Sequence, residues 1–164
     1  MRTHYVAIGA VLVIGIGCGL VSGQPTFVPL PAPVGSGYGL AQGVSADGTK
    51  VAGTCCDCVG YSYQYATQWT VCGGTVTGQA LSDPYTQETF AEAISDDGTT
   101  VVGAVAFPDG FYIPCRWVNG TRQNLDLEPE GGNWGYGQGV SADGNVVVGM
   151  NGMMYVSYGF IWQN

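Results

Sequence analysis

The sequence predicts an all-β fold made of three copies of a repeat of about 45 to 50 residues. Three observations carry this prediction: a motif that recurs along the chain, a composition rich in glycine and aromatic residues, and frequent signals for tight turns. The 164-residue chain has 28 glycines, 46% hydrophobic residues and only 10% charged residues. This composition suits short strands joined by tight turns, because turns need glycine and strands favour aromatic and β-branched residues.

The recurring motif begins with small and acidic residues and ends in apolar residues and a glycine. It reads GVSADGTKVAG from Gly43, AISDDGTTVVG from Ala93 and GVSADGNVVVG from Gly139. Each copy is followed by a variable stretch and then by a tryptophan, at Trp69, Trp117 and Trp162. The tryptophans are 48 and 45 residues apart, so the motif and the tryptophan keep one period.

Each copy predicts about four short antiparallel strands. The Asp-Gly pair indicates a hairpin turn, because glycine takes the positive φ of a tight turn and aspartate tolerates that geometry. Apolar residues on both sides of the pair form two strands, a third strand leads into the tryptophan, and a weaker fourth follows around Leu81 and Leu125–Leu127. Such repeats favour propeller-like blades around a pseudo-symmetry axis, and a pseudo-threefold trefoil or prism is the alternative.

We expect one domain, residues 24–164, with repeats at about 38–89, 90–135 and 136–164. The last repeat lacks a strand after its tryptophan, and the apolar segment 26–31 is a candidate to complete it by joining the two ends. Closed propellers typically have about four to eight blades, so two chains in a six-bladed ring is a further hypothesis. The oligomeric state stays open at this point.

Residues 1–23 have the pattern of a secretory signal peptide. Arg2 supplies positive charge, Val6–Val21 is uncharged and largely apolar, and small residues up to Gly23 offer a cleavage site. The protein is therefore expected to be secreted, periplasmic or on the cell surface. An uncleaved membrane anchor and a lipid anchor on Cys18 are the alternatives, and we expect membrane contact only through one of them.

The cysteines of the mature chain are expected to form disulfides, because exported proteins meet an oxidising environment. The candidates are Cys55, Cys56, Cys58, Cys72 and Cys115. Five cysteines allow two pairs and leave one thiol, and pairs within the cluster 55–72 are the economical choice. Zinc binding by this cluster is the alternative, although adjacent cysteines do not easily point at one ion. We expect no metal and no other cofactor.

Charge and composition argue against several kinds of chemistry. Twelve acidic residues against four basic ones give a net charge of −8, which disfavours nucleic acid as a partner. The only histidine, His4, lies in the predicted signal, so the mature chain lacks the usual base of a nucleophilic triad. Asp47, Asp97 and Asp143 all precede glycine and are interpreted as turn residues, with calcium binding as the alternative.

Two groups of aromatic residues are candidate binding residues. One comprises Tyr61, Tyr63 and Tyr65 in the first repeat, and the other comprises Trp134 and Tyr136. Exposed tyrosine and tryptophan give a large, rigid contact area that suits stacking against sugars or docking of a protein. The three tryptophans that keep the repeat period are instead expected in the core.

The GVSADG run, the Val-Val-Gly after it and the pairs Arg116-Trp117 and Ile161-Trp162 resemble the extracellular repeats of the HAF family, found in exported bacterial proteins. The resemblance covers about residues 26–164 and is poorer in the first repeat, where the cysteine cluster replaces the usual small polar loop. It implies propeller-like blades and an extracytoplasmic location. It transfers no catalytic residues.

The sequence therefore favours a non-enzymatic surface or envelope protein that acts as a binding or assembly module. Its expected partners are further copies of the chain, a surface protein or a carbohydrate. The alternative is a secreted carbohydrate-active hydrolase that uses loop carboxylates. The candidates for that role are Asp83, Glu88, Glu92, Glu128 and Glu130. Such an enzyme needs two carboxylates about 5 to 10 Å apart in one cleft.

Overall fold

The structure is a computed structural model that describes residues 27–35, 37–57, 63–82, 88–108, 110–125, 134–153 and 156–164. All regular structure in these residues is β-strand, which confirms the predicted all-β class. Within the same ranges, no helix is long and apolar enough to cross a membrane.

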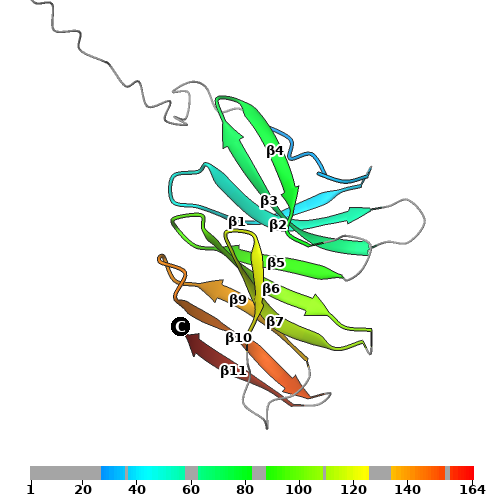
Figure 1. Cartoon of the computed structure of the whole chain (residues 1–164), viewed down its shortest axis with the longest axis vertical. Helices are drawn as coiled ribbons and strands as arrows, with labels where there is room; N and C mark the ends of the chain where they lie inside the picture. Colours follow the sequence, from blue (N-terminus) through cyan, green and yellow to red (C-terminus); the bar gives the residue numbers. More distant parts are fainter. Residues whose placement is uncertain are drawn as a thin grey trace, which may run out of the picture.

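The strands follow the predicted repeats as three antiparallel meanders (Figure 1). The first meander comprises β1 (Gly39–Val44), β2 (Lys50–Asp57), β3 (Tyr63–Cys72) and β4 (Thr75–Ala80). The second comprises β5 (Thr89–Ile94), β6 (Thr100–Ala106), β7 (Tyr112–Val118) and β8 (Thr121–Asn124). The third comprises β9 (Trp134–Val140), β10 (Val146–Met153) and β11 (Val156–Gln163). Four strands per repeat are thus confirmed for the first two meanders.

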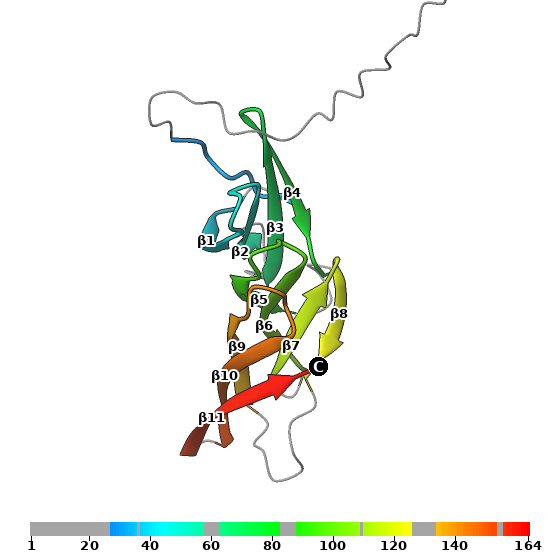
Figure 2. The same cartoon turned by 90° about the vertical axis from the view of Figure 1, so that its left-hand side faces the viewer.

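The three meanders form two hydrogen-bonded sheets. The first meander is a sheet of its own, with the order β1-β2-β3-β4. The second and third share one sheet, because Tyr112 of β7 and Trp134 of β9 form a parallel bridge. Successive meanders also pack against each other, and Figure 2 shows them following one another along the long axis of the molecule.

Each Asp-Gly turn is held by the same hydrogen bonds. In the first, Ser45 Oγ donates to Asp47 Oδ1 at 2.7 Å, and the Asp47 carboxylate accepts the Thr49 backbone N–H at 3.0 Å. The Lys50 backbone N–H donates to Ser45 Oγ at 2.9 Å, which starts β2. The following glycine, Gly48, has a φ of +70°. The turns at 95–100 and 141–146 repeat this pattern.

These hydrogen bonds lower the pKa values of the three turn aspartates. Hydrogen bonds from Ser141 and from the backbone and side chain of Asn145 lower the pKa of Asp143 to about 2. The pKa values of Asp47 and Asp97 are lowered in the same direction by the equivalent serine and threonine. The interpretation of the three aspartates as turn residues is therefore confirmed.

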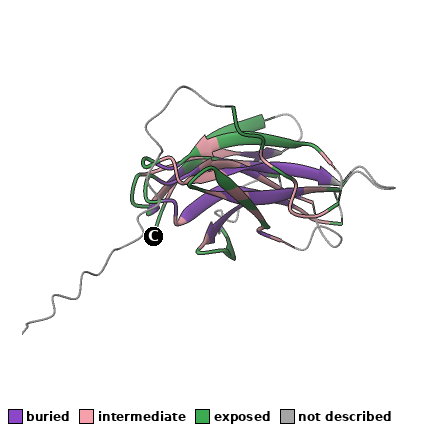
Figure 3. Cartoon of the chain, turned by 90° about the horizontal axis from the view of Figure 1, so that it is seen from above, coloured by how far each residue is buried: buried purple, intermediate pink, exposed green. Residues whose placement is uncertain are grey.

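Two core layers lie between the meanders, and Figure 3 shows buried residues running through the middle of the molecule. The layer between the first and second meanders includes Ala52, Val101 and the fully buried Trp117. The layer between the second and third includes Val102 and Val147, with Trp162 packed at its margin. The repeat tryptophans therefore pack as the sequence predicts.

A third cluster lies on the outer face of the first meander, under residues 27–35. Tyr65 OH donates to the carbonyl oxygen of Val34 at 2.6 Å, and Trp69 Nε1 donates to that of Pro31 at 2.7 Å. The segment 26–31 was expected to complete the last repeat. Its described part, 27–31, lies at the opposite end of the molecule from β11 (Figure 1). The buried donors of Tyr65 and Trp69 explain the difference, because they need acceptors that this segment supplies.

The cysteines correct part of the disulfide prediction. Cys55, Cys56 and Cys115 are thiols. Across the strands Cys55 pairs with Gly39 and Tyr65, and Cys115 pairs with Gly103 and Asn124, so neither has a cysteine opposite to it. Burial raises the pKa of both thiols, which keeps them protonated and unreactive. Cys72 is disulfide-bonded, and Cys58 lies outside the described residues.

Candidate functional site

Four aromatic rings gather where the second and third meanders meet, and we call them the aromatic cluster. They are Phe90 of β5, Tyr112 of β7, and Trp134 and Tyr136 of β9. The Tyr112 and Tyr136 rings stack with centroids 5.4 Å apart. Trp134 meets Tyr136 edge-on at 5.6 Å, and Phe90 lies 5.6 Å from Tyr112 and 6.1 Å from Tyr136. With 38% of its surface exposed, Trp134 is the ring most open to solvent.

The sequence Trp-Gly-Tyr-Gly explains how β9 brings these rings close to the second meander. Gly135 and Gly137 alternate with the two aromatic residues along the strand. A Cβ on Gly135 would lie 3.0 Å from Pro114 Cγ and 2.5 Å from the Met150 carbonyl oxygen. A Cβ on Gly137 would lie 3.4 Å from Val102 Cβ. Glycine at both positions therefore lets the strand pack tightly while the aromatic rings meet those of the second meander.

A polar residue occupies the bulge on the first strand of every meander. The register of β1 shifts between Ala41 and Gly43, and that of β5 shifts between Ala91 and Ala93. The register of β9 skips one residue in the same way. The residues at these bulges are Gln42, Glu92 and Gln138, which we call the polar row. A bulge leaves its extra residue outside the ladder and redirects the side chain, and bulges are enriched near binding sites.

The polar row and the aromatic cluster meet at Glu92. Gln42 Nε2 donates to Glu92 Oε2 at 3.4 Å, which links the first and second meanders. Burial raises the pKa of Glu92. Burial, together with Tyr112, Glu92 and Glu88, raises the pKa of Tyr136 to about 12. Tyr136 is therefore a neutral hydroxyl donor at neutral pH, beside an acidic acceptor.

A buried acceptor lies on the neighbouring strand. Asn151 of β10 pairs with Gly135, between the two aromatic residues of β9. Its Oδ1 is buried and accepts no hydrogen bond from the described residues. Paired residues of an antiparallel ladder share a face of the sheet, so Asn151 lies on the face of Gly135, opposite to the Trp134 and Tyr136 side chains. Buried polar atoms are nearly always satisfied, so this oxygen calls for a donor such as a buried water.

Two of the described cationic side chains, Lys50 and Arg116, are engaged away from the aromatic cluster. Lys50 Nζ donates to Thr70 Oγ1 at 2.8 Å. Arg116 donates to Gln123 Oε1 at 2.9 Å and to Asn164 Oδ1 at 3.1 Å, and it stacks over the Trp162 ring at 4.3 Å. The candidate site thus combines aromatic surface with neutral and acidic hydrogen-bonding groups.

The structure separates the two predicted aromatic groups. Trp134 and Tyr136 come together as expected. Tyr65 is fully buried with its hydroxyl bonded to Val34, which makes it a core residue and corrects its assignment as a binding residue. Tyr63 is exposed at the start of β3, and Tyr61 lies outside the described residues.

Sequence reasoning missed Phe90, Tyr112 and the polar row. Phe90 and Tyr136 hold the same position in successive repeats, so an alignment of the repeats would have paired them.

The candidate carboxylates of a hydrolase are only partly described. Glu88 and Glu92 both lie near Tyr136, because both act on its pKa. Asp83, Glu128 and Glu130 lie outside the described residues. Among the residues that the structure describes, no three His, Cys, Asp or Glu side chains come together as a metal site.

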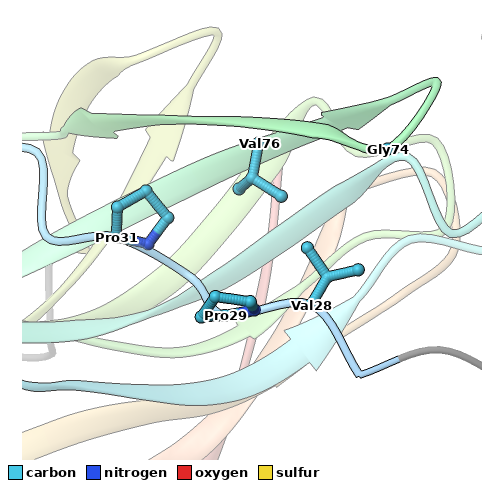
Figure 4. Close-up of a pocket in the computed structure, with 5 residues that line it drawn as sticks. All are labelled: Val28, Pro29, Pro31, Gly74 and Val76. Atoms are coloured by element: carbon cyan, nitrogen blue, oxygen red, sulfur yellow. The ribbon is translucent and has the colours of Figure 1, made fainter.

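A separate hollow lies beside the first meander. It has a volume of about 330 Å³ and lies between the N-terminal segment and the β3–β4 hairpin (Figure 4). Its lining is apolar and consists of Val28, Pro29, Pro31, Gly74 and Val76. No side chain of this lining carries a polar group, so the hollow lacks side-chain hydrogen-bonding groups that would orient a ligand.

Comparison with known proteins gives a likeness of fold. A scan of protein-family models and a search of the curated proteins find no match. The chain is similar to the crystal structure of TolB from Acinetobacter baumannii, with a TM-score of 0.51, 16% identity, and coverage of 77% of this chain and 30% of that one. It is also similar to a candidate TolB from Agrobacterium tumefaciens, with a TM-score of 0.53, 14% identity, and coverage of 77% and 46%. The chain thus spans less than half the length of either neighbour.

Proposed function

We propose that this protein is an exported, non-enzymatic binding module of the HAF type, built from propeller-like blades, that binds glycans at the aromatic cluster. The observation that carries this proposal is the meeting of four aromatic rings from two repeats beside Glu92. Export rests on the signal-like pattern of residues 1–23, which lie outside the described residues.

The arrangement of the meanders supports propeller-like blades over a trefoil or prism. Blades of a propeller are four-stranded antiparallel sheets that follow one another around an axis. The first two meanders have four strands in sequential order, and each packs on the next with its first strands in contact. The likeness in fold to the two TolB structures agrees with this arrangement.

The chemistry of the site favours a glycan over other ligands. Aromatic rings stack against the apolar faces of sugars, while carboxylate, amide and phenol groups bond to hydroxyls. A net charge of −8 disfavours anionic ligands such as nucleic acid.

Binding of neutral oligosaccharides by the purified, secreted protein tests the proposal. We expect a glycan array to give a positive class, and titration calorimetry to show that Trp134→Ala weakens binding at least about fivefold, as loss of a stacking contact of about 1 to 3 kcal/mol implies. Tyr63→Ala is the matched control, since Tyr63 is exposed to a similar extent, 36% against 38%. Absence of glycan binding, or equal loss in both variants, would refute the assignment.

The hydrolase alternative rests on Glu92, because a partly buried carboxyl with a raised pKa is what a general acid needs. The same glycan separates the two functions. A binding module leaves the reducing ends of the bound oligosaccharide unchanged over time. Release of new reducing ends that Glu92→Gln abolishes would establish the enzyme instead.

A further inference from the structure

The third meander has an open apolar face whose counterparts in the other two meanders are buried. The face comprises Val148 and Met150 of β10, and Gly159 and Ile161 of β11, and we call it the third-meander face. Val148 is 46% exposed and Ile161 is 67% exposed. None of the described residues covers these two side chains.

The residues of this face have equivalents at the same repeat positions in the other two meanders. Val148, Val102 and Ala52 each lie two residues after the start of the second strand of their meander. Val102 and Ala52 are both fully buried, because the next meander packs on them. Ile161 is the residue before the repeat tryptophan, as Gln68 and Arg116 are in their meanders. The open face is thus the surface on which a further layer of β-structure would pack.

The residue before the tryptophan indicates that this layer is not another copy of the repeat in the usual orientation. Gln68 Nε2 donates to the carbonyl oxygen of Gly98, and Arg116 Nη1 donates to that of Gly144. Both glycines belong to the Asp-Gly turn of the incoming meander. Ile161 has no donor, so a meander docked in this way would bury its glycine carbonyl without a partner. An apolar surface brings no such carbonyl.

The opposite end of the molecule limits how two chains can associate. The outer face of the first meander is covered by residues 27–35, which are anchored at Tyr65 and Trp69. A head-to-tail contact would need that face, and it would produce open-ended assemblies. With one end covered, the apolar surface that each chain leaves open to a second copy is the third-meander face.

We propose that the third-meander face binds the same face of a second copy of this chain and forms a closed, two-fold dimer. The contact places Val148, Met150 and Ile161 of one chain against the same residues of its partner. This inference is independent of the glycan site, which involves other residues. It also replaces the six-bladed ring, because that ring needs the covered face of the first meander.

Sedimentation equilibrium of the full, secreted chain tests the proposal. We expect a mass twice that of one chain, with Val148→Asp and Ile161→Arg raising the dissociation constant at least about a hundredfold, because each buries a charge without a partner. Val44→Asp is the matched control, since Val44 is exposed on β1 of the first meander, away from the face. It should leave the dimer intact.

Folding of the variants is checked by circular dichroism and thermal unfolding. Ile161 is the more exposed of the two positions, so Ile161→Arg should leave the fold unchanged even if Val148→Asp does not. A wild-type chain that is monomeric at all concentrations would overturn the proposal. So would a dimer that Ile161→Arg leaves intact, or assemblies that grow beyond two chains.

Discussion

Replacing Gly103 by alanine would place a methyl group where the backbone of β5 leaves no room. A Cβ on Gly103 would lie 1.8 Å from the carbonyl oxygen of Phe90, more than 1 Å closer than real Cβ atoms come to any atom. Gly53 has the same relation to Leu40, at 1.9 Å, and Gly149 to Tyr136, at 2.0 Å. These three glycines end the three copies of the repeated motif. Each copy ends in glycine because the backbone of the neighbouring bulged strand lies too close for a side chain.

The expected loss of stability follows from the atom that the new methyl group would meet, the carbonyl oxygen of Phe90. A backbone oxygen cannot move aside without disturbing the pairing of β5 with β6, so we expect the upper part of the range for overpacking, about 3 kcal/mol. For a domain of this size, that lowers the unfolding midpoint by about 6 to 12 °C. Gly53→Ala should cost a similar amount. Of these two variants, only Gly103→Ala should also weaken glycan binding, because Phe90 belongs to the aromatic cluster and Leu40 does not.

Thermal unfolding followed by circular dichroism measures the effect. The control is Gly159→Ala, since a Cβ there would meet its nearest atom, the Gly149 carbonyl oxygen, at an ordinary 3.8 Å. None of these glycines has a positive φ, so the comparison isolates packing from backbone conformation. A fall of less than about 2 °C for Gly103→Ala, or an equal fall for Gly159→Ala, would refute the reasoning.

Three further predictions concern stability and reactivity. Arg116→Met should destabilise the fold by about 1 to 3 kcal/mol in urea unfolding, because the carbonyl oxygen of Gly144 and two amide oxygens lose their donor. The pKa of Asp143 is lowered from 3.8 to about 2, so its contribution to stability is present above pH 4 and is lost as the pH falls towards 2. The unfolding midpoint should drop in that window, and Asp143→Asn should reduce the drop. The thiols of Cys55 and Cys115 are fully buried, so an alkylating reagent followed by mass spectrometry should label them only after unfolding.

The period of the repeat and the turn-forming Asp-Gly pairs made the fold predictable from the sequence. The Asp-Gly pairs and the tryptophans mark local events, a turn and a buried ring, and the structure places both as expected. The interpretation of the N-terminal segment was wrong because its position depends on two distant donors, Tyr65 and Trp69. Their need for acceptors is invisible until β3 is placed in three dimensions.

The candidate site was predictable only in part, for a related reason. Trp134 and Tyr136 stand out because two aromatic residues separated by glycine are unusual. Phe90 and Tyr112 look like ordinary strand residues. Tyr112 joins the site through the parallel bridge between β7 and β9, and Phe90 joins it through the packing of β5 against β9. Bulges also escape sequence reading, since Gln42 and Glu92 sit in runs that look like regular alternation. Cys55, Cys56 and Cys115 failed as disulfide candidates because strand pairing, not closeness in sequence, decides which side chains face each other.

Residues that keep the repeat and residues that break it have different roles in this chain. Three kinds of residue recur because every meander needs them. The aspartates hold the Asp-Gly turns, the motif glycines let the bulged first strand approach closely, and the repeat tryptophans pack in the core. The position before the tryptophan changes from Gln68 to Arg116 to Ile161, and the change follows what lies on it. The first two donate to a turn of the next meander, whereas Ile161 meets no such turn and is exposed. The residue before the tryptophan is therefore a hydrogen-bond donor in the two meanders that another meander covers, and apolar in the meander whose face is open. This change indicates that the third-meander face makes a different kind of contact. The same logic applies to Trp134, which stands where Glu88 stands in the preceding repeat and converts a polar position into aromatic surface.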